Sequence, residues 1–227
     1  MRRSVSAKRQ REGAPDAGLS KARVVLEAIH IADREGVEAL SMRRLASTLG
    51  AGAMSLYHYV ASKDELLDAM IDVVFSEIEL PDMAADWKTA MRDRSCSARD
   101  VLGRHPWAVA IIESRTAPGP ANLRHREAVA ACLRRAGFSV VMATHANWLL
   151  DSYVYGYVLQ IASLPFDTAD ELVEMIDEVY LPQLSPVEFP YLNESATELQ
   201  AAGYDPSEEF GFGLDLILAA LEPLRSS

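Results

Sequence analysis

The stretch SLYHYV, residues 55–60, holds a hydroxyl, two phenols and an imidazole within five residues: Ser55, Tyr57, His58 and Tyr59. Such groups bind phosphate oxygens and base edges, so the chemistry they suggest is recognition of nucleic acid. Leu56 and Val60 are one helical turn apart and would anchor a short helix to a core. The four polar side chains would then face outward, where they need a partner.

A catalytic alternative would use His125 or His145 together with Asp151. The last two are six residues apart, a spacing that does not place them on one helix face. The sequence contains no nucleophile elbow, phosphate loop or metal-spaced set of His and Glu. Cys96 and Cys132, its two cysteines, indicate reduced thiols of a cytoplasmic protein. We therefore expect no enzyme activity, no metal and no cofactor.

The charge distribution divides the chain into a basic head and an acidic body. Residues 1–63 contain 11 Lys and Arg against 6 Asp and Glu, a balance of +5. Residues 64–227 contain 11 against 27, a balance of −16, which dominates the net charge of −11. Only the head is therefore suited to approach phosphates. No apolar run is long enough to span a bilayer, and the basic N-terminus lacks the apolar region of a secretory signal.

Short helices account for the head. Ser20 caps a helix that ends at Gly36, and a second helix starts near Ser41 and ends at Gly50. A third is expected over residues 53–60, after a tight turn at residues 51–52. Residues 62–65 read as a capping box that opens a longer helix.

The body also reads as helical throughout, because apolar residues recur at helical spacing and no strand pair or hairpin signal is present. The fold class is therefore all-α. The expected domains are a disordered basic arm at 1–19, a helix-turn-helix domain at 20–80 and a helical domain at 81–227. The helices expected in the body lie at 87–102, 106–114, 122–136, 139–164, 168–181, 193–202 and 207–224, with a Pro-rich loop at 182–190.

Two short helices joined by a Gly-containing turn describe a helix-turn-helix, whose second helix enters the major groove. Ala53 and Met54 would then contact thymine methyl groups, and Ser55 would bind a base or a phosphate. The flanking side chains that would reach phosphates are Tyr57, His58 and Tyr59.

Basic residues beside these helices complete the predicted DNA surface. Arg43 is the candidate for a bidentate guanine contact, with Arg44 as its alternative. Lys63 combines its charge with the positive end of the next helix, which suits a phosphate.

The head resembles the DNA-binding domain of the tetracycline-repressor (TetR/AcrR) family of bacterial transcriptional regulators. The resemblance lies in the stretch ALSMRRLASTLG and in the later stretch SLYHYVASKDELL. The resemblance implies that Arg43 and residues 53–59 contact an operator and that Tyr57 and Lys63 hold phosphates. Gly52 and Ala53 are smaller than their usual counterparts, so base readout would depend heavily on Arg43.

The body resembles the family's ligand-binding domain in the tetracycline-repressor-like subgroup, over GRHPWAVAIIESR, GPANLRHREAVAACLRRAGFS and FPYLNESATELQAAGYDPSEEFGFGLDLILAALEPL. The resemblance implies a repressor that a small molecule releases from double-stranded operator DNA. It also implies a homodimer formed by helices 139–164 and 207–224. A binding module that acts only through protein partners is the remaining alternative, and salt-dependent DNA affinity would exclude it.

Polar groups on the apolar helix 139–164 suggest where a ligand binds. Asn147, Asp151 and Tyr155 follow one another at four-residue spacing, and a buried Asp is costly unless it is paired. Asp151 therefore either faces a ligand or pairs with an internal arginine. The candidate ligand-binding residues are Trp87, Met91, Trp107, Arg115, His125, Asn147, Trp148, Asp151 and Tyr155.

The N-terminal arm contains five basic residues within its first eleven positions. Such an arm either follows phosphates or a minor groove, or is an idle solvated extension. The sequence favours neither.

Overall fold

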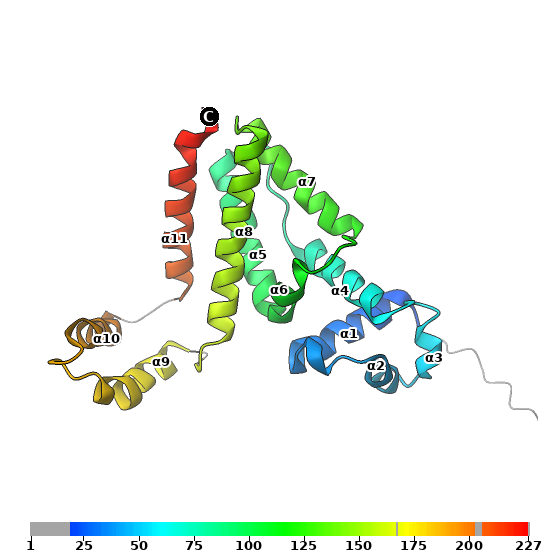
Figure 1. Ribbon diagram of the computed structural model, residues 1–227, viewed down its shortest axis with the longest axis horizontal. Coiled ribbons are helices and arrows are strands. Elements are labelled where there is room, and N and C mark those ends of the chain that lie inside the picture. The colour runs from blue at the N-terminus through cyan, green and yellow to red at the C-terminus, as the bar shows by residue number, and fades with distance from the viewer. Residues whose placement is uncertain (1–18, 167, 203–205, 227) are drawn as a thin grey trace, which may run out of the picture. The chain divides into compact units, whose positions relative to one another are not determined.

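The computed structural model describes residues 19–166, 168–202 and 206–226, and every regular element in this part of the chain is helical (Figure 1). The expected all-α fold is thus confirmed. The chain forms two compact units, unit 1 at residues 1–67 and unit 2 at residues 68–227. The division falls inside helix α4 (Lys63–Glu77). The predicted N-terminal arm lies outside the described residues except for Leu19.

Unit 1 is built from three helices before α4. Helix α1 (Lys21–Glu35) and helix α2 (Met42–Thr48) are each capped by a serine, Ser20 and Ser41, whose hydroxyl accepts a backbone N–H. A 3₁₀ turn, η1 (Val37–Ala39), connects them. Gly36 and Gly50 have φ of +83° and +67°, a region that side chains disfavour, so glycine ends both helices as predicted.

Helix α3 (Ala53–Leu56) is shorter than the expected 53–60. After Leu56 the chain tightens into i→i+3 hydrogen bonds, from the His58 N–H to the Ser55 carbonyl and from the Tyr59 N–H to the Leu56 carbonyl. This tightening is a common way for a helix to end. Leu56 and Val60 are fully buried, which confirms their predicted role as anchors.

The start of α4 is held by the predicted pairing of Ser62 and Glu65. The Ser62 hydroxyl accepts the Glu65 N–H at 3.0 Å, while the Glu65 carboxylate accepts the Ala61 N–H at 2.7 Å. The carboxylate therefore bonds one residue before the position that a standard capping box uses. Its other oxygen pairs with Lys21 Nζ at 2.7 Å, which ties α4 to α1.

Unit 2 surrounds one long helix, α8 (Val140–Ala162), capped by Ser139. Its buried residues recur every three or four positions, and α8 packs against α5, α6, α7 and α11. The packed helices are α5 (Trp87–Arg104), α6 (Pro106–Ile112), α7 (Pro120–Arg135) and α11 (Pro206–Leu221). Among the described residues, no helix is both long and apolar enough to cross a membrane.

The segment between α8 and α11 differs from expectation. The single helix predicted over 168–181 is α9 (Ala169–Met175), followed by a π-helical turn, η2 (Ile176–Tyr180), and a 3₁₀ turn, η3 (Leu181–Gln183). Pro182 lacks the N–H that would continue a helix. Helix α10 (Pro190–Ala202) starts earlier than the expected residue 193, with Pro190 in its first turn.

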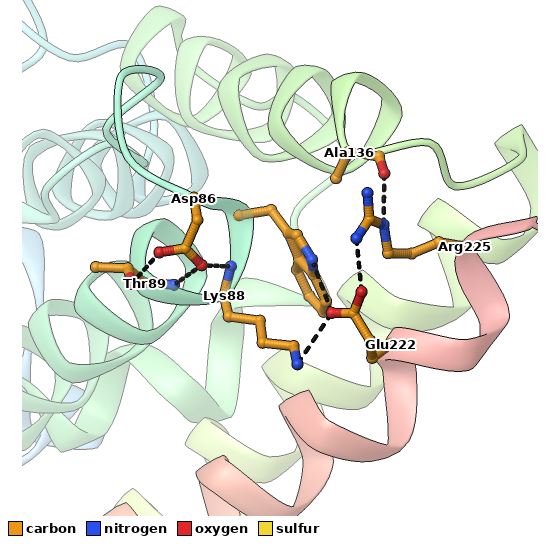
Figure 2. Close-up of polar contacts among 7 residues, drawn as sticks. Asp86, Lys88, Thr89, Ala136, Glu222 and Arg225 are labelled. Atoms are coloured by element: carbon orange, nitrogen blue, oxygen red, sulfur yellow. Dashed lines mark hydrogen bonds and ion pairs between the residues drawn. The ribbon is translucent and has the colours of Figure 1, made fainter.

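The C-terminal turn η4 (Glu222–Ser226) fastens α5 to the end of α7 (Figure 2). Glu222 accepts hydrogen bonds from Trp87 Nε1 at 3.2 Å and Arg225 Nη1 at 2.6 Å, and pairs with Lys88 at 2.9 Å. Arg225 Nε also donates to the Ala136 carbonyl at 2.6 Å. Trp87 is therefore part of a structural clamp.

Candidate functional site

The outer surface of α2 and α3 presents most of the residues predicted to contact DNA. Ala53, Met54 and Ser55 are exposed on α3, and Met54 has 78% of its surface accessible. The Ser55 hydroxyl makes no hydrogen bond within the described part of the chain. Leu56 faces the core behind them. The first turn of α3 thus offers two apolar groups and one hydroxyl to a partner.

The two arginines at the start of α2 differ in their contacts. Both Arg44 Nη2 contacts with the Glu35 carboxylate are 2.5 Å, so Arg44 is held against the end of α1. Arg43 is exposed and pairs with no other described residue. Of the two alternatives that the sequence left open, Arg43 is the one whose guanidinium is available.

The remaining predicted contacts flank this surface. Tyr57 and His58 are exposed in the turn after α3, whereas Tyr59 is half-buried. Lys63 is exposed at the first residue of α4, where backbone N–H groups make the helix end positive. These groups suit oxyanions.

In unit 2, two adjoining hollows lie between α7 and α8. The larger, a groove of about 450 Å³, runs along the facing sides of both helices. The smaller, a recess of about 90 Å³, reaches Glu113, Asp151 and Tyr155. The two hollows adjoin, since both are lined by Arg126, Asn147 and Trp148, and we call the pair the α7–α8 depression.

A buried polar network forms the inner wall of this depression. Arg94 is only 3% exposed, and its Nε donates to His125 Nε2 at 3.1 Å. Its Nη2 is 2.7 Å from Asp151 Oδ1, an ion pair that lacks hydrogen-bond geometry. Asn147 donates to the other Asp151 oxygen at 3.1 Å. Asp151 thus pairs with an internal arginine, which is one of the two predicted alternatives, and it also borders the recess. Its contact with a ligand stays a prediction.

The network fixes the protonation of its neighbours. Burial, together with the positive charges of Arg94 and Arg126, lowers the pKa of His125 to about 3. Its Nε2 accepts from Arg94, so the ring proton lies on Nδ1. Burial and the Asp151 carboxylate raise the pKa of the Tyr155 hydroxyl. His125 is therefore a neutral acceptor and Tyr155 a neutral hydroxyl.

The other residues predicted to bind a ligand lie elsewhere in unit 2. Trp87 joins the clamp described above and borders a separate hollow of about 310 Å³. Met91 and Trp107 are buried, and Arg115 Nε donates to Asp68 on α4 at 2.6 Å. The structure thus brings Asn147, Trp148, Asp151 and Tyr155 together, with His125 behind them.

Several residues at the depression were absent from the predicted set, among them Arg94, Glu113 and Arg126. Arg94 lies in a stretch rich in charge, RDRSCSAR, and nothing local distinguishes it from its neighbours. The costly burial of Asp151 predicted an arginine partner but could not identify which one. Arg126 and Glu113 are brought there only by the packing of α6 and α7 on α8.

The same geometry bears on catalysis and on metal binding. Arg94 lies between His125 and Asp151 and occupies the imidazole nitrogen that a general base would use. His145 is exposed on another face of α8. Within the described residues, no three His, Cys, Asp or Glu side chains are arranged to hold a metal ion.

Exposed apolar side chains follow α8 and α11. On α8 they include Val141, Leu149 and Leu159, at helical spacing. On α11 Phe212 is 66% exposed and Leu216 is 57% exposed. Two neighbouring helices with apolar outer faces are typical of a surface that a partner covers.

Comparisons with known proteins match both units. Residues 26–70 match the family described as "Bacterial regulatory proteins, tetR family". Residues 80–224 match the family described as "Tetracyclin repressor-like, C-terminal domain".

Curated relatives and a solved structure agree with these matches. The HTH-type transcriptional repressor DrrR1 of Streptomyces coeruleorubidus is 34% identical over 92% of this chain and 80% of its own length. Tetracycline repressor protein class G of Vibrio anguillarum is 29% identical over 92% and 96%. The crystal structure of the TetR family protein ActR of Streptomyces coelicolor in complex with actinorhodin superposes with a TM-score of 0.73 at 32% identity, covering 92% and 100%.

Proposed function

The chain belongs to the tetracycline-repressor family of bacterial transcriptional regulators, and we propose that it binds operator DNA through the exposed surface of α2 and α3. In this proposal it acts as a homodimer in the cytoplasm, where the chromosome is. A small molecule bound in the α7–α8 depression releases it. The function is regulatory rather than catalytic.

The observation that supports operator binding best is the unpaired state of Arg43 on α2, together with the exposed first turn of α3. Arg44 is neutralised by Glu35, but Arg43 pairs with no described residue and extends from the same short helix. An unpaired guanidinium on α2, with the exposed Ser55 and Met54 on α3, matches the donors and apolar groups that read the major groove. The basic balance of residues 1–63 adds attraction to phosphates.

Operator binding is tested by a gel shift of the full chain on the DNA that flanks its own gene. The shift is measured across a salt series and with excess competitor DNA. A specific, salt-sensitive complex is expected. No specific complex there, and none from a random-sequence selection, would rule out direct DNA binding in favour of a module that acts through protein partners.

Arg43→Ala and Lys63→Ala are expected to weaken operator binding in different ways. Arg43→Ala should cost about 1–3 kcal/mol and relax the preference at one base position, because a bidentate base contact is lost. Lys63→Ala should weaken binding to all sequences alike and reduce the salt slope by about one. Fluorescence anisotropy on operator variants separates the two. Equal losses on every sequence from Arg43→Ala would contradict its role in base readout.

The homodimer is supported by the exposed apolar faces of α8 and α11. In a four-helix bundle of two copies, each helix would bury the residues that a monomer leaves open, such as Phe212 and Leu216. A dimer would place two recognition helices roughly 34–36 Å apart, one turn of DNA. A ligand releases such a dimer only if it binds the released state better.

Leu216→Glu is expected to convert the dimer into a monomer without unfolding it, because position 216 is already 57% exposed. Sedimentation equilibrium should show the dissociation constant rising by about 100-fold or more. The matched control is Leu123→Glu on α7, where the leucine is 54% exposed on another helix. If both variants or neither dissociate, the dimer does not use α11.

The effector site is proposed from the depression and from the relatives together. The solved structure of ActR holds actinorhodin, so a chain of this fold accepts a small molecule. In this chain the depression between α7 and α8 combines an aromatic wall with polar groups at its inner end, as small-molecule sites do.

A further inference from the structure

The cations of unit 2 fall into two groups. Seven of its eleven Lys and Arg side chains form ion pairs with carboxylates: Lys88, Arg92, Arg94, Arg99, Arg104, Arg115 and Arg225. The other four pair with no carboxylate among the described residues, and all of them lie on α7: Arg124, Arg126, Arg134 and Arg135. From residue 136 to residue 224 the chain has no further Lys or Arg. Uncompensated positive charge in this acidic unit is therefore confined to one helix.

Two of these four arginines, Arg126 and Arg134, line the groove between α7 and α8, together with one carboxylate, Glu127. Arg126 Nε donates to Asn122 Oδ1 at 2.8 Å, and Arg134 Nη1 donates to the Phe138 carbonyl. These contacts orient both guanidinium groups. Their remaining N–H groups have no partner within the described residues. Eight residues separate the two arginines, which is roughly 12 Å along the helix.

Small alanines and one aromatic side chain line the groove between these cations. Ala130, Ala131 and Ala143 line it with little side-chain volume. Trp148 lies at its side with 66% of its surface exposed, so an indole face is available for stacking. A volume of about 450 Å³ lies within the range of small-molecule sites.

The inner recess has room only for a substituent. It measures about 90 Å³ and is bordered by Asn147, Asp151 and Tyr155. The Tyr155 hydroxyl makes no hydrogen bond to another described residue, and its raised pKa keeps it a donor. The Asp151 charge is compensated by Arg94, and the Glu113 carboxylate, which also borders the recess, can accept a hydrogen bond from a hydroxyl group. The recess suits a carbonyl or hydroxyl group attached to the ring.

We propose that the ligand of the α7–α8 depression is a flat aromatic acid of two to four fused rings. Its carboxylate or phenolate pairs with Arg126 or Arg134, its rings stack on Trp148, and an oxygen substituent enters the recess. This inference rests on the proposed effector site and assigns the chemical class of its ligand. An acidic ligand is favoured because a guanidinium already oriented by the protein binds an anion at little entropic cost.

The test is calorimetric titration of the full chain with anthracene-2-carboxylate, its neutral carboxamide and the cationic 2-(aminomethyl)anthracene. These three probes share a ring system and differ in charge. The acid is expected to bind about tenfold or more tightly than the amide, with the amine weakest. Equal binding of acid and amide, tighter binding of the amine, or no binding of any probe would overturn the inference.

Variants locate the site. Arg126→Gln is expected to lower affinity for the acid by about tenfold and leave affinity for the amide unchanged, since only an anion uses the lost charge. The control is Arg124→Gln, an equally unpaired arginine on α7 that does not line the groove. Trp148→Leu should weaken all three probes. If Arg126→Gln and Arg124→Gln behave alike, the acid binds elsewhere and the assignment fails.

Failure of this inference is distinguishable from failure of the proposed function. The gel shift on operator DNA is run on the same protein without any probe. If DNA binding is retained and no acid binds, only the ligand class is overturned. If the acid binds with the expected pattern but no operator is found, the ligand class stands and the regulatory role does not.

Discussion

Replacing Asp151 with alanine is expected to lower the free energy of unfolding of unit 2 by about 3–5 kcal/mol, because it leaves a buried arginine without its counter-ion. Arg94 is 3% exposed, and its Nη1 already has no hydrogen-bond partner among the described residues. After the substitution only His125 would accept from this guanidinium. Urea unfolding of the full chain, followed by circular dichroism, measures the change.

Two further variants distinguish the ion pair from other effects of the substitution. Asn147→Ala removes one hydrogen bond to the same carboxylate and should cost only about 1 kcal/mol. The double variant Arg94→Met with Asp151→Leu replaces the pair by apolar side chains and should recover most of the loss. If Asp151→Ala costs no more than Asn147→Ala, the Arg94 charge is compensated by other means.

Leu56→Ala is expected to cost about 2–5 kcal/mol in the stability of unit 1 and to abolish operator binding. Leu56 is fully buried, and it anchors α3, which has only four residues. A helix this short has little stability of its own and depends on its packing. Thermal unfolding together with the gel shift measures both effects.

The control is Met54→Ala on the same helix, where the methionine is 78% exposed. The free energy of unfolding of the Met54→Ala variant should change by no more than about 0.5 kcal/mol, since the substitution removes no buried group. A loss of operator affinity from Met54→Ala would therefore report a DNA contact rather than unfolding. Intact operator binding by Leu56→Ala would show that α3 is held by other contacts or does not read DNA.

Local signals predicted the elements of the fold well. Serine caps and glycine stops gave the ends of α1 and α2, because each acts through hydrogen bonds or dihedral angles within a few residues. Helix α3 was expected to be longer, since apolar spacing at Leu56 and Val60 does not distinguish a helix from a tighter turn with the same side-chain directions. The π-helical turn after α9 had no signal in the sequence.

The candidate sites were predicted to different degrees. Most of the candidate DNA surface lies within one short segment, so residues 53–59 could be proposed from the helix-turn-helix pattern together with the family resemblance. The sequence preferred Arg43 to Arg44, and the structure adds a physical reason, because Glu35 at the end of another helix pairs with Arg44. The depression joins α6, α7 and α8, and the Asp151 partner lies 57 positions earlier in the chain. An ion pair between residues so far apart in the chain depends on how the helices pack, and local sequence patterns do not specify that packing.

The donation from Arg94 to His125 has a consequence for how the protein would respond to acidity. The pKa of His125 is lowered to about 3 and the pKa of Tyr155 is raised from its ordinary value of about 10. Neither group gains or loses a proton between roughly pH 5 and pH 9. Any pH dependence of ligand binding that arises at these two side chains is therefore absent in this range, and a change of affinity with pH would report the ionisation of the proposed ligand instead.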